Sequence, residues 1–131
     1  MIDLEAHVFD RIFSDVAPLV PEGCFKSMAE PKPPAFPFAT LYETDNFTDR
    51  KNRSSAREED YAIVTYEANV YAMTKAECRN VMAALDEGMT RLGFMRLSLQ
   101  FVPNLSDPVI FRYTARYQAV ADLQKVIYRR S

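Results

Sequence analysis

The side chains that most often carry chemistry are sparse in this chain. Its one histidine, His7, falls on a predicted surface helix beside no nucleophile, and a histidine without an orienting partner seldom acts as a catalytic base. The two cysteines, Cys24 and Cys78, match no metal-ligand spacing and no disulfide framework, so we expect reduced thiols. These residues indicate neither a nucleophile–base pair nor a metal site.

The carboxylates are not arranged as a general acid–base pair. Asp86 and Glu87 are adjacent on a predicted helix, so their side chains point in different directions. The acids at 58–60 follow a basic segment, and we expect them to be solvated or ion-paired. With three glycines and no G-x-x-x-x-G-K motif, the chain lacks the common phosphate-cradling loops. We therefore predict a protein that is not an enzyme, with no catalytic residues, no metal and no cofactor.

Positive charge is concentrated in one polar segment, residues 50–57. Four basic residues fall within these eight positions: Arg50, Lys51, Arg53 and Arg57. Such a cluster could contact the phosphates of DNA. The alternative is a solvated hairpin tip that Asp45, Asp49 and the acids at 58–60 partly neutralise. For a single copy, we favour the solvated tip. In a ring of identical copies, the same loop from every copy would lie in one place and would face a partner or DNA.

Length and composition predict one domain spanning residues 1–131. A chain of 131 residues has an ordinary size for one domain, and 48% hydrophobic residues suit a packed core. The formal net charge of −2 gives no general attraction to nucleic acid or to an anionic membrane. We find no signal peptide and no apolar stretch of about 18 residues. We therefore expect a protein that is made and used in a cytoplasm, without a membrane partner.

The spacing of apolar residues predicts both helices and strands. Helical spacing marks residues 3–17, where Asp3 is a candidate N-cap, and residues 74–92. Alternation predicts strands at 22–28, 36–44, 59–73, 94–102 and 109–121. Within 94–102, one face is expected to hold Met95, Leu97, Leu99 and Phe101, and the other Arg96, Ser98 and Gln100.

The helix at 74–92 has the clearest boundaries. Thr74 and Glu77 form a capping box at its start, and Gly93 stands where a left-handed C-cap is favoured. Its apolar stripe predicts core positions that include Cys78, Leu85 and Leu92.

The strand at 59–73 is longer than the usual five or six residues and has two usable faces. One face is apolar: Val64, Tyr66, Ala68, Val70 and Ala72. The other face is mixed rather than plainly solvated, and it is typical of a surface that meets a partner. We predict an interface strand through Tyr61, Ile63, Thr65, Glu67 and Tyr71.

Together these elements predict an α+β fold. Two helices should cover one face of a four- or five-stranded, mainly antiparallel sheet. The polar residues 45–58 bury too little to be ordered alone, and we expect them to form a long, extended and mobile hairpin loop.

The order and residue types of several segments resemble a known family. These segments are YEANVYAMTKAECRNVM (66–82), ALDEGMTRLGFMRLS (84–98), VPNLSDPVIFRYTARYQAV (102–120), IYRR (127–130) and PPAFPFATLYETDN (33–46). They cover most of residues 33–130, and they resemble the tail terminator, or tail-completion, proteins of bacteriophages and prophages with long non-contractile tails. The resemblance is in spacing and residue type and includes no catalytic signature.

The resemblance implies a structural virion protein. Proteins of this family form a ring, usually of six copies, that caps the completed tail tube and joins it to the head connector. The implied partners are copies of the chain, the tail tube protein and a head–tail connector protein, with DNA passing through the channel. The implied location is the head–tail joint of the virion, with assembly in the host cytoplasm. The family has no cofactor and no catalytic residues.

Three other readings remain open at this point. The first is a nucleic-acid-binding module that uses the basic segment 50–57. The second is another component of the head–tail connector. The third is a small α+β enzyme, for which the sequence offers no nucleophile–base pair and no metal ligands.

Overall fold

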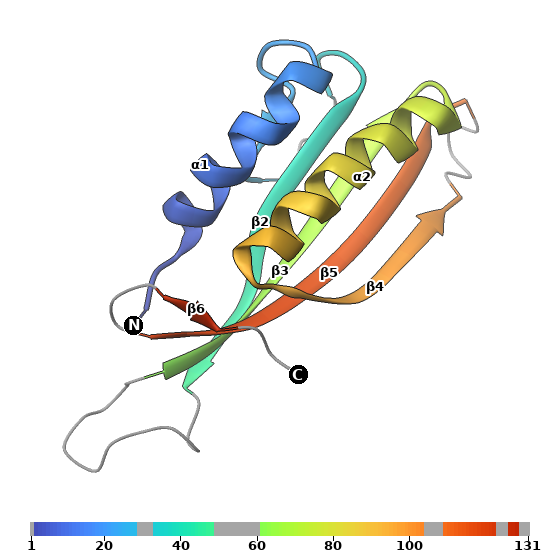
Figure 1. Cartoon of the computed structure of the whole chain (residues 1–131). Helices are drawn as coiled ribbons and strands as arrows, with labels where there is room; N and C mark the ends of the chain where they lie inside the picture. The colour runs from blue at the N-terminus through green and yellow to red at the C-terminus, as the bar shows by residue number, and fades with distance from the viewer. Residues whose placement is uncertain (1, 29–32, 49–60, 104–108, 123–125, 129–131) are drawn as a thin grey trace, which may run out of the picture.

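The computed structural model describes residues 2–28, 33–48, 61–103, 109–122 and 126–128 (Figure 1). In these residues the chain forms two α-helices, one short 3-10 helix and six strands. In chain order the elements are α1 (Glu5–Val16), η1 (Ala17–Leu19), β1 (Phe25–Lys26), β2 (Phe38–Thr48), β3 (Tyr61–Ala72), α2 (Lys75–Leu92), β4 (Met95–Val102), β5 (Phe111–Asp122) and β6 (Ile127–Tyr128).

The strands form one mixed, mostly antiparallel sheet in the order β1-β2-β3-β5-β4, and β6 pairs with the end of β5. Only β1 and β2 are parallel among the pairs that the structure describes. Both helices lie side by side on one face of this sheet (Figure 1). The predicted fold class is confirmed: an α+β fold with five strands along the main path and two helices on one face.

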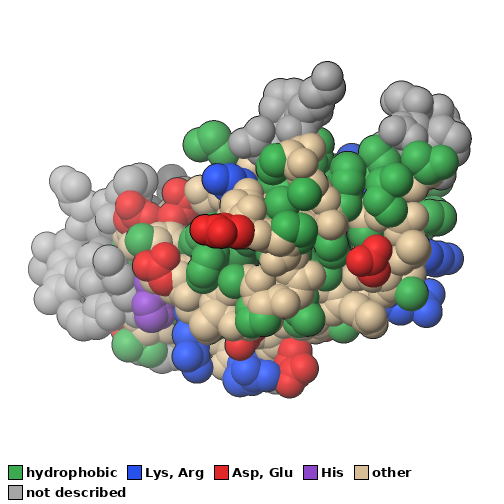
Figure 2. All heavy atoms as spheres, turned by 90° about the horizontal axis from the view of Figure 1, so that it is seen from above, with side chains coloured by type: hydrophobic (Ala, Val, Ile, Leu, Met, Phe, Trp, Pro, Cys, Tyr) green, Lys and Arg blue, Asp and Glu red, His purple; other side chains and the backbone are tan. Residues whose placement is uncertain are grey.

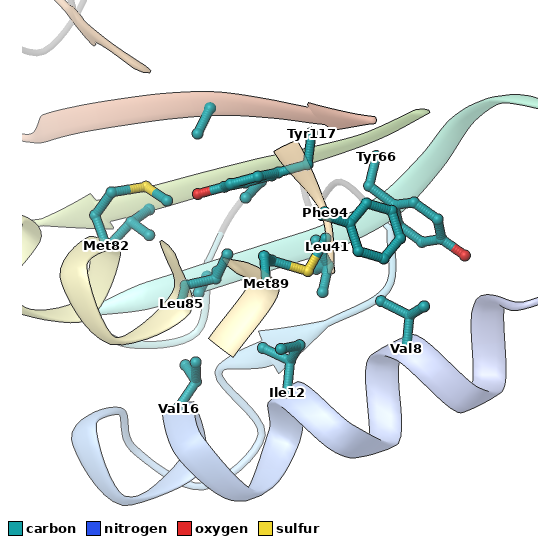
Figure 3. Close-up of a cluster of buried hydrophobic side chains, with 14 of the residues drawn as sticks. Val8, Ile12, Val16, Leu41, Tyr66, Met82, Leu85, Met89, Phe94 and Tyr117 are labelled. Atoms are coloured by element: carbon teal, nitrogen blue, oxygen red, sulfur yellow. The ribbon is translucent and has the colours of Figure 1, made fainter. Parts of the chain in front are cut away.

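The core lies between the helices and the sheet (Figure 3). β3 directs Ala62, Val64, Tyr66, Ala68, Val70 and Ala72 toward the helices, and all six are buried. From α1 come Val8, Ile12 and Val16, and from α2 come Leu85 and Met89, as Figure 3 shows. Cys78 and Leu85 are fully buried as predicted, while Leu92 packs half-buried against the edge of the core.

The sequence signals at the ends of α2 are confirmed. The Thr74 hydroxyl accepts a hydrogen bond from the backbone N–H of Glu77 at 3.1 Å. The same hydroxyl lies 3.3 Å from the Glu77 carboxylate and can donate to it. Gly93 has a φ of 108°, a conformation that favours glycine, and its N–H bonds the carbonyl of Thr90 at 3.0 Å. These caps fix where α2 begins and where the chain turns into β4.

The two helices approach each other closely at Gly88. A Cβ at this position would lie 2.7 Å from the Ile12 side chain and 2.9 Å from the Asp15 carboxylate, so only glycine fits without a shift. The start of α1 differs from the prediction: Leu4 is the N-cap residue, and Asp3 accepts a hydrogen bond from the N–H of Glu5 at 3.1 Å. The packed helix pair lies over β2, β3 and β5, and β4 runs along one side of α2 (Figure 1).

Shifts of register in β4 and β2 change parts of the sequence prediction. A shift of register between Arg96 and Ser98 places Arg96 on the helix side of β4 and Met95 on the opposite side. The assignment of Arg96 to the face with Ser98 and Gln100 is therefore wrong, and so is that of Met95 to the face with Leu99 and Phe101. A similar shift in β2 lies between Glu43 and Asp45, after which the strand continues to Thr48. Residues 45–48 of the predicted loop are therefore strand.

Candidate functional site

The face of the sheet opposite the helices is the main candidate surface. Among the described residues, no helix covers it. Each row of this face crosses β2, β3 and β5: Tyr42 pairs with Glu67 and Glu67 with Arg116, while Thr40 pairs with Asn69 and Asn69 with Thr114. We call this surface the outer face. It carries all of the predicted interface residues: Tyr61, Ile63, Thr65, Glu67 and Tyr71.

The outer face is ordered although no helix covers it. Ile63, Thr65 and Asn69 are buried there, between paired residues of β2 and β5. Glu67 and Tyr71 are half-buried. Asn69 was not among the predicted interface residues, although its position two residues from Glu67 in a strand places it on the same face. The surface is therefore a set of fixed side chains.

A hydrogen-bond network centred on Glu67 holds the middle of this face. The Tyr42 hydroxyl donates to Glu67 Oε2 at 2.5 Å, and Asn69 Nδ2 donates to the same oxygen at 3.1 Å. Arg116 Nε lies 3.5 Å from the other carboxylate oxygen. Arg112 donates to Asn69 Oδ1 through its terminal nitrogen at 2.8 Å. Charge-assisted bonds of this kind are stronger than neutral ones, and they restrict each side chain to one position.

The network shifts the acid–base properties of its members. Burial alone would raise the pKa of Glu67, but the hydrogen bonds from Tyr42 and Asn69 and the nearby guanidinium groups of Arg116 and Arg112 outweigh it and lower the pKa. Burial and the hydrogen bond to the Glu67 carboxylate raise the pKa of Tyr42 to about 12. Near neutral pH the Glu67 carboxylate is therefore ionised and accepts hydrogen bonds, while the Tyr42 hydroxyl keeps its proton and donates to it.

Aromatic rings complete one end of the outer face. The rings of Phe38 and Tyr71 stack with their centres 6.4 Å apart. The guanidinium of Arg112 lies 5.4 Å from the centre of the Tyr71 ring. A cation over an aromatic face is attracted by the ring quadrupole. Tyr71 and Arg112 therefore form this end of the face, with the buried Phe38 ring packed against Tyr71.

A second polar cluster joins the N-terminal segment to β2. Asn46 Nδ2 donates to the carbonyl of Ile2 at 2.7 Å and to Glu43 Oε1 at 3.3 Å. Burial, together with the charges of Glu5, Asp3 and Asp45, raises the pKa of Glu43 although the Asn46 bond opposes this. Within the described part of the chain, the buried Tyr66 hydroxyl has no hydrogen-bond partner. The cluster fixes the chain start against the sheet.

The groups most suited to catalysis are not assembled into a site. Cys78 is buried, its thiol donates to the carbonyl of Val70 at 3.1 Å, and burial raises its pKa to about 11. Cys24 is buried and His7 is exposed on α1. Among the residues that the structure describes, no group of three His, Cys, Asp or Glu side chains is placed to hold a metal ion.

The predicted basic residues Arg50, Lys51, Arg53 and Arg57 lie outside the described residues. The chain leaves β2 at Thr48 and enters β3 at Tyr61, two antiparallel neighbours in the middle of the sheet. None of the described helices is long and apolar enough to cross a membrane.

Comparison with known proteins shows the fold. No protein-family model matches the chain, and no curated protein matches it in sequence. A chain of the virion of a native gene transfer agent particle matches in structure with a TM-score of 0.61 and 13% identity, over 86% of this chain and 92% of that one.

The sheath/tube terminator of an extracellular contractile injection system, in its extended state, matches with a TM-score of 0.38 and 11% identity. That alignment covers 100% of this chain and 62% of the other. The first likeness shows that this chain has the fold of a chain from the virion of a native gene transfer agent particle.

Proposed function

We propose that this chain is a structural subunit of a phage-like tail, a terminator that closes the tail tube and joins it to the head. The observation that carries the proposal is the fold shared with a virion protein over 86% of this chain. The sequence resemblance to tail terminators in residues 33–130 supports the same assignment. In this role the protein acts at the head–tail joint of the virion after assembly in the host cytoplasm.

The terminator works as a ring of copies, with six as the number implied by the resemblance. A closed ring presents one end to the tail tube protein and the other to the head connector protein, so that tube growth stops and the joint is made. The ordered outer face, with Tyr61, Ile63, Thr65, Glu67 and Tyr71, suits contact with a partner, because its side chains lose little further freedom on binding.

The basic segment is the part of the chain suited to DNA. In a ring, Arg50, Lys51, Arg53 and Arg57 of each copy would line the channel or the partner surface. Like charges gathered in this way repel one another unless an anion lies between them. DNA phosphate, or the acids at 58–60 of a neighbouring copy, would supply that negative charge.

Removal of the protein from cells that produce the particle tests the proposal. Electron microscopy should then show heads and tails that are not joined, with tails of irregular length. Adding the purified wild-type protein back to such an extract should restore joined particles. Joined particles of normal tail length in its absence would rule out the terminator role.

A DNA-binding measurement on the isolated protein distinguishes the terminator from the main alternative, a nucleic-acid-binding module. A nucleic-acid-binding module would bind duplex DNA with an affinity that falls steeply with salt, in proportion to the phosphates contacted. Such binding together with normal particle assembly in the absence of the protein would favour that module over a terminator.

A further inference from the structure

One edge of the sheet, at β4, exposes apolar side chains on a strand that the helices leave uncovered. Leu97, Leu99 and Phe101 are 47%, 40% and 40% exposed. In the described residues no strand pairs with the outer side of β4. Phe101 is held in place by the rings of Phe111 and Tyr113, whose centres lie 6.1 Å and 5.5 Å away. An apolar, unpaired edge strand is a surface that native proteins normally cover.

The opposite edge of the sheet carries an apolar pocket at the end of α1. Its volume is about 250 Å³, and it is lined by Phe13, Ala17, Val20, Pro21, Glu22, Gly23 and Phe25. Phe13 is 47% exposed and stacks on Phe25 with 5.9 Å between the ring centres. Phe9 stacks on Phe25 as well, at 4.6 Å. The pocket therefore has rigid aromatic walls that are open to a partner.

Each edge carries one charged side chain, of opposite sign, for which the described residues supply no ion pair. Lys75 Nζ lies 4.9 Å from the centre of the Phe101 ring, and no described carboxylate pairs with it. Glu22 lines the pocket, and within the described residues it has no ion pair or hydrogen bond. A cation beside the apolar strand thus matches an anion beside the apolar pocket.

The apolar end of β4 and the pocket beside α1 lie toward the same end of the molecule. The C-terminal end of α1, the start of α2 and the end of β4 all lie at the upper end in Figure 1. Figure 2 shows hydrophobic side chains that reach the surface across this end. Both features also belong to the helix side of the sheet, because Phe101 pairs with Tyr113, which directs its ring toward the helix layer.

We propose that the β4 edge of one copy packs against the α1–β1 edge of the next, with Phe101 against the Phe13–Phe25 pocket and Lys75 beside Glu22. The proposal rests on the proposed function, in which copies form a ring, and it names the surfaces that join them. The next copy's α1 then covers β4 in the way that the chain's own α1 covers β2. A contact between two different surfaces repeats head to tail and closes into a ring when the rotation allows it.

A symmetric contact of β4 with β4 is the less favourable arrangement. It would leave Lys75 of each copy without Glu22 as a partner, and it would leave the aromatic pocket of both copies uncovered. It would also stop at two copies, because each copy would use the same surface. The outer face takes no part in the head-to-tail contact, and it stays available for the tail tube or the channel.

Two complementary variants of the full-length chain test the head-to-tail contact. Phe101→Asp removes the strand surface, and Phe13→Asp removes the pocket. By sedimentation at high protein concentration, wild type should form closed assemblies and each variant alone should be monomeric. A mixture of the two should form a 1:1 pair and nothing larger, because one good strand surface then meets one good pocket.

Two further measurements test whether a loss of association is caused by unfolding or by a change at another surface. Melting curves establish that each variant is folded, and the milder pair Lys75→Glu and Glu22→Lys avoids the aromatic core altogether. Each charge change should weaken association about two- to fivefold at low salt, and the double change should restore it. Phe47→Asp, on the outer face, should associate as wild type does.

The outcomes are distinguishable from those of the terminator test. Assemblies that persist in both aromatic variants, or that fail in Phe47→Asp, would overturn the proposed contact and assign self-association to another surface. A wild-type protein that remains monomeric at high concentration would overturn the contact in solution. Joining of heads and tails by that same protein would still support the terminator role.

Discussion

The two faces of β3 are ordered by different means. Toward the helices, Val64, Tyr66 and Val70 are buried in an apolar core, where order comes from close packing. On the outer face, Glu67 and Asn69 are held by hydrogen bonds and ion pairs to the flanking strands. A surface whose side chains are already held by polar bonds can meet a partner with little further ordering. One strand thus supports the fold with one face and is free to serve assembly with the other.

The largest effect is expected on the helix side. Leu85→Ala removes a fully buried side chain between α2 and the sheet, and it should lower the free energy of unfolding by about 2–5 kcal/mol. Urea denaturation of the purified variant measures this loss. A loss below about 0.5 kcal/mol would mean that the α2 stripe contributes little to the core.

The N-cap of α2 should contribute less. Thr74→Ala removes the acceptor for the Glu77 N–H, and it should cost about 1 kcal/mol in the same denaturation experiment. Thr74→Ser is the matched control, because it retains the hydroxyl and should stay close to wild type. Equal losses in both variants would show that the hydroxyl bond is not the cause.

The stability that the outer face contributes should depend on pH. The pKa of Glu67 is lowered from 4.5, so the ionised carboxylate contributes to the stability of the fold above that pH. This contribution is lost as the pH falls through the lowered pKa. Glu67→Gln should therefore flatten the loss of stability on the acid side. Unfolding free energies measured from about pH 3 to about pH 7 would reveal the difference.

Glu43 supplies a control of opposite sign. Burial raises its pKa above 4.5, so its contribution is greatest at low pH and is lost as the pH rises through the raised pKa. Glu43→Gln should remove this loss on the rising side of the curve. If both variants changed the curve in the same direction, the contrast between a carboxylate beside hydrogen-bond donors and guanidinium groups and a carboxylate beside other acids would be wrong.

Local signals allowed the sequence to predict α2 and the faces of β3. Thr74, Glu77 and Gly93 act within a few residues of the helix ends, so their effect can be read without knowing the fold. The alternation in β3 likewise places Tyr61, Ile63, Thr65, Glu67 and Tyr71 on one face, where the structure has them. Their role as an interface stays a prediction.

Features that depend on register could not be predicted in this way. The Glu67 network joins residues on three strands, and Arg112 meets Asn69 only because their strands pair at that position. The shift of register beside Arg96 moves that side chain next to Asp86, at 3.3 Å, against the expected alternation. The parallel pairing of β1 with β2 is also non-local. Such contacts are set by tertiary packing rather than by residue spacing.

The smallest effect on stability is expected from the basic segment. Replacement of Arg50, Lys51, Arg53 and Arg57 with Ser should leave the melting temperature nearly unchanged, because a segment of charged residues, Ser and Asn buries little apolar surface. The same variant should join fewer heads to tails or retain less DNA, since it removes four positive charges from every copy of the ring. Melting curves and electron microscopy of particles made with the variant measure the two properties separately.

If the variant unfolds, the segment belongs to the core. If it folds and supports normal particles, the segment is only a solvated tip. Assembly would then depend on the β4 edge, the Phe13–Phe25 pocket and the outer face of the sheet, without the basic segment.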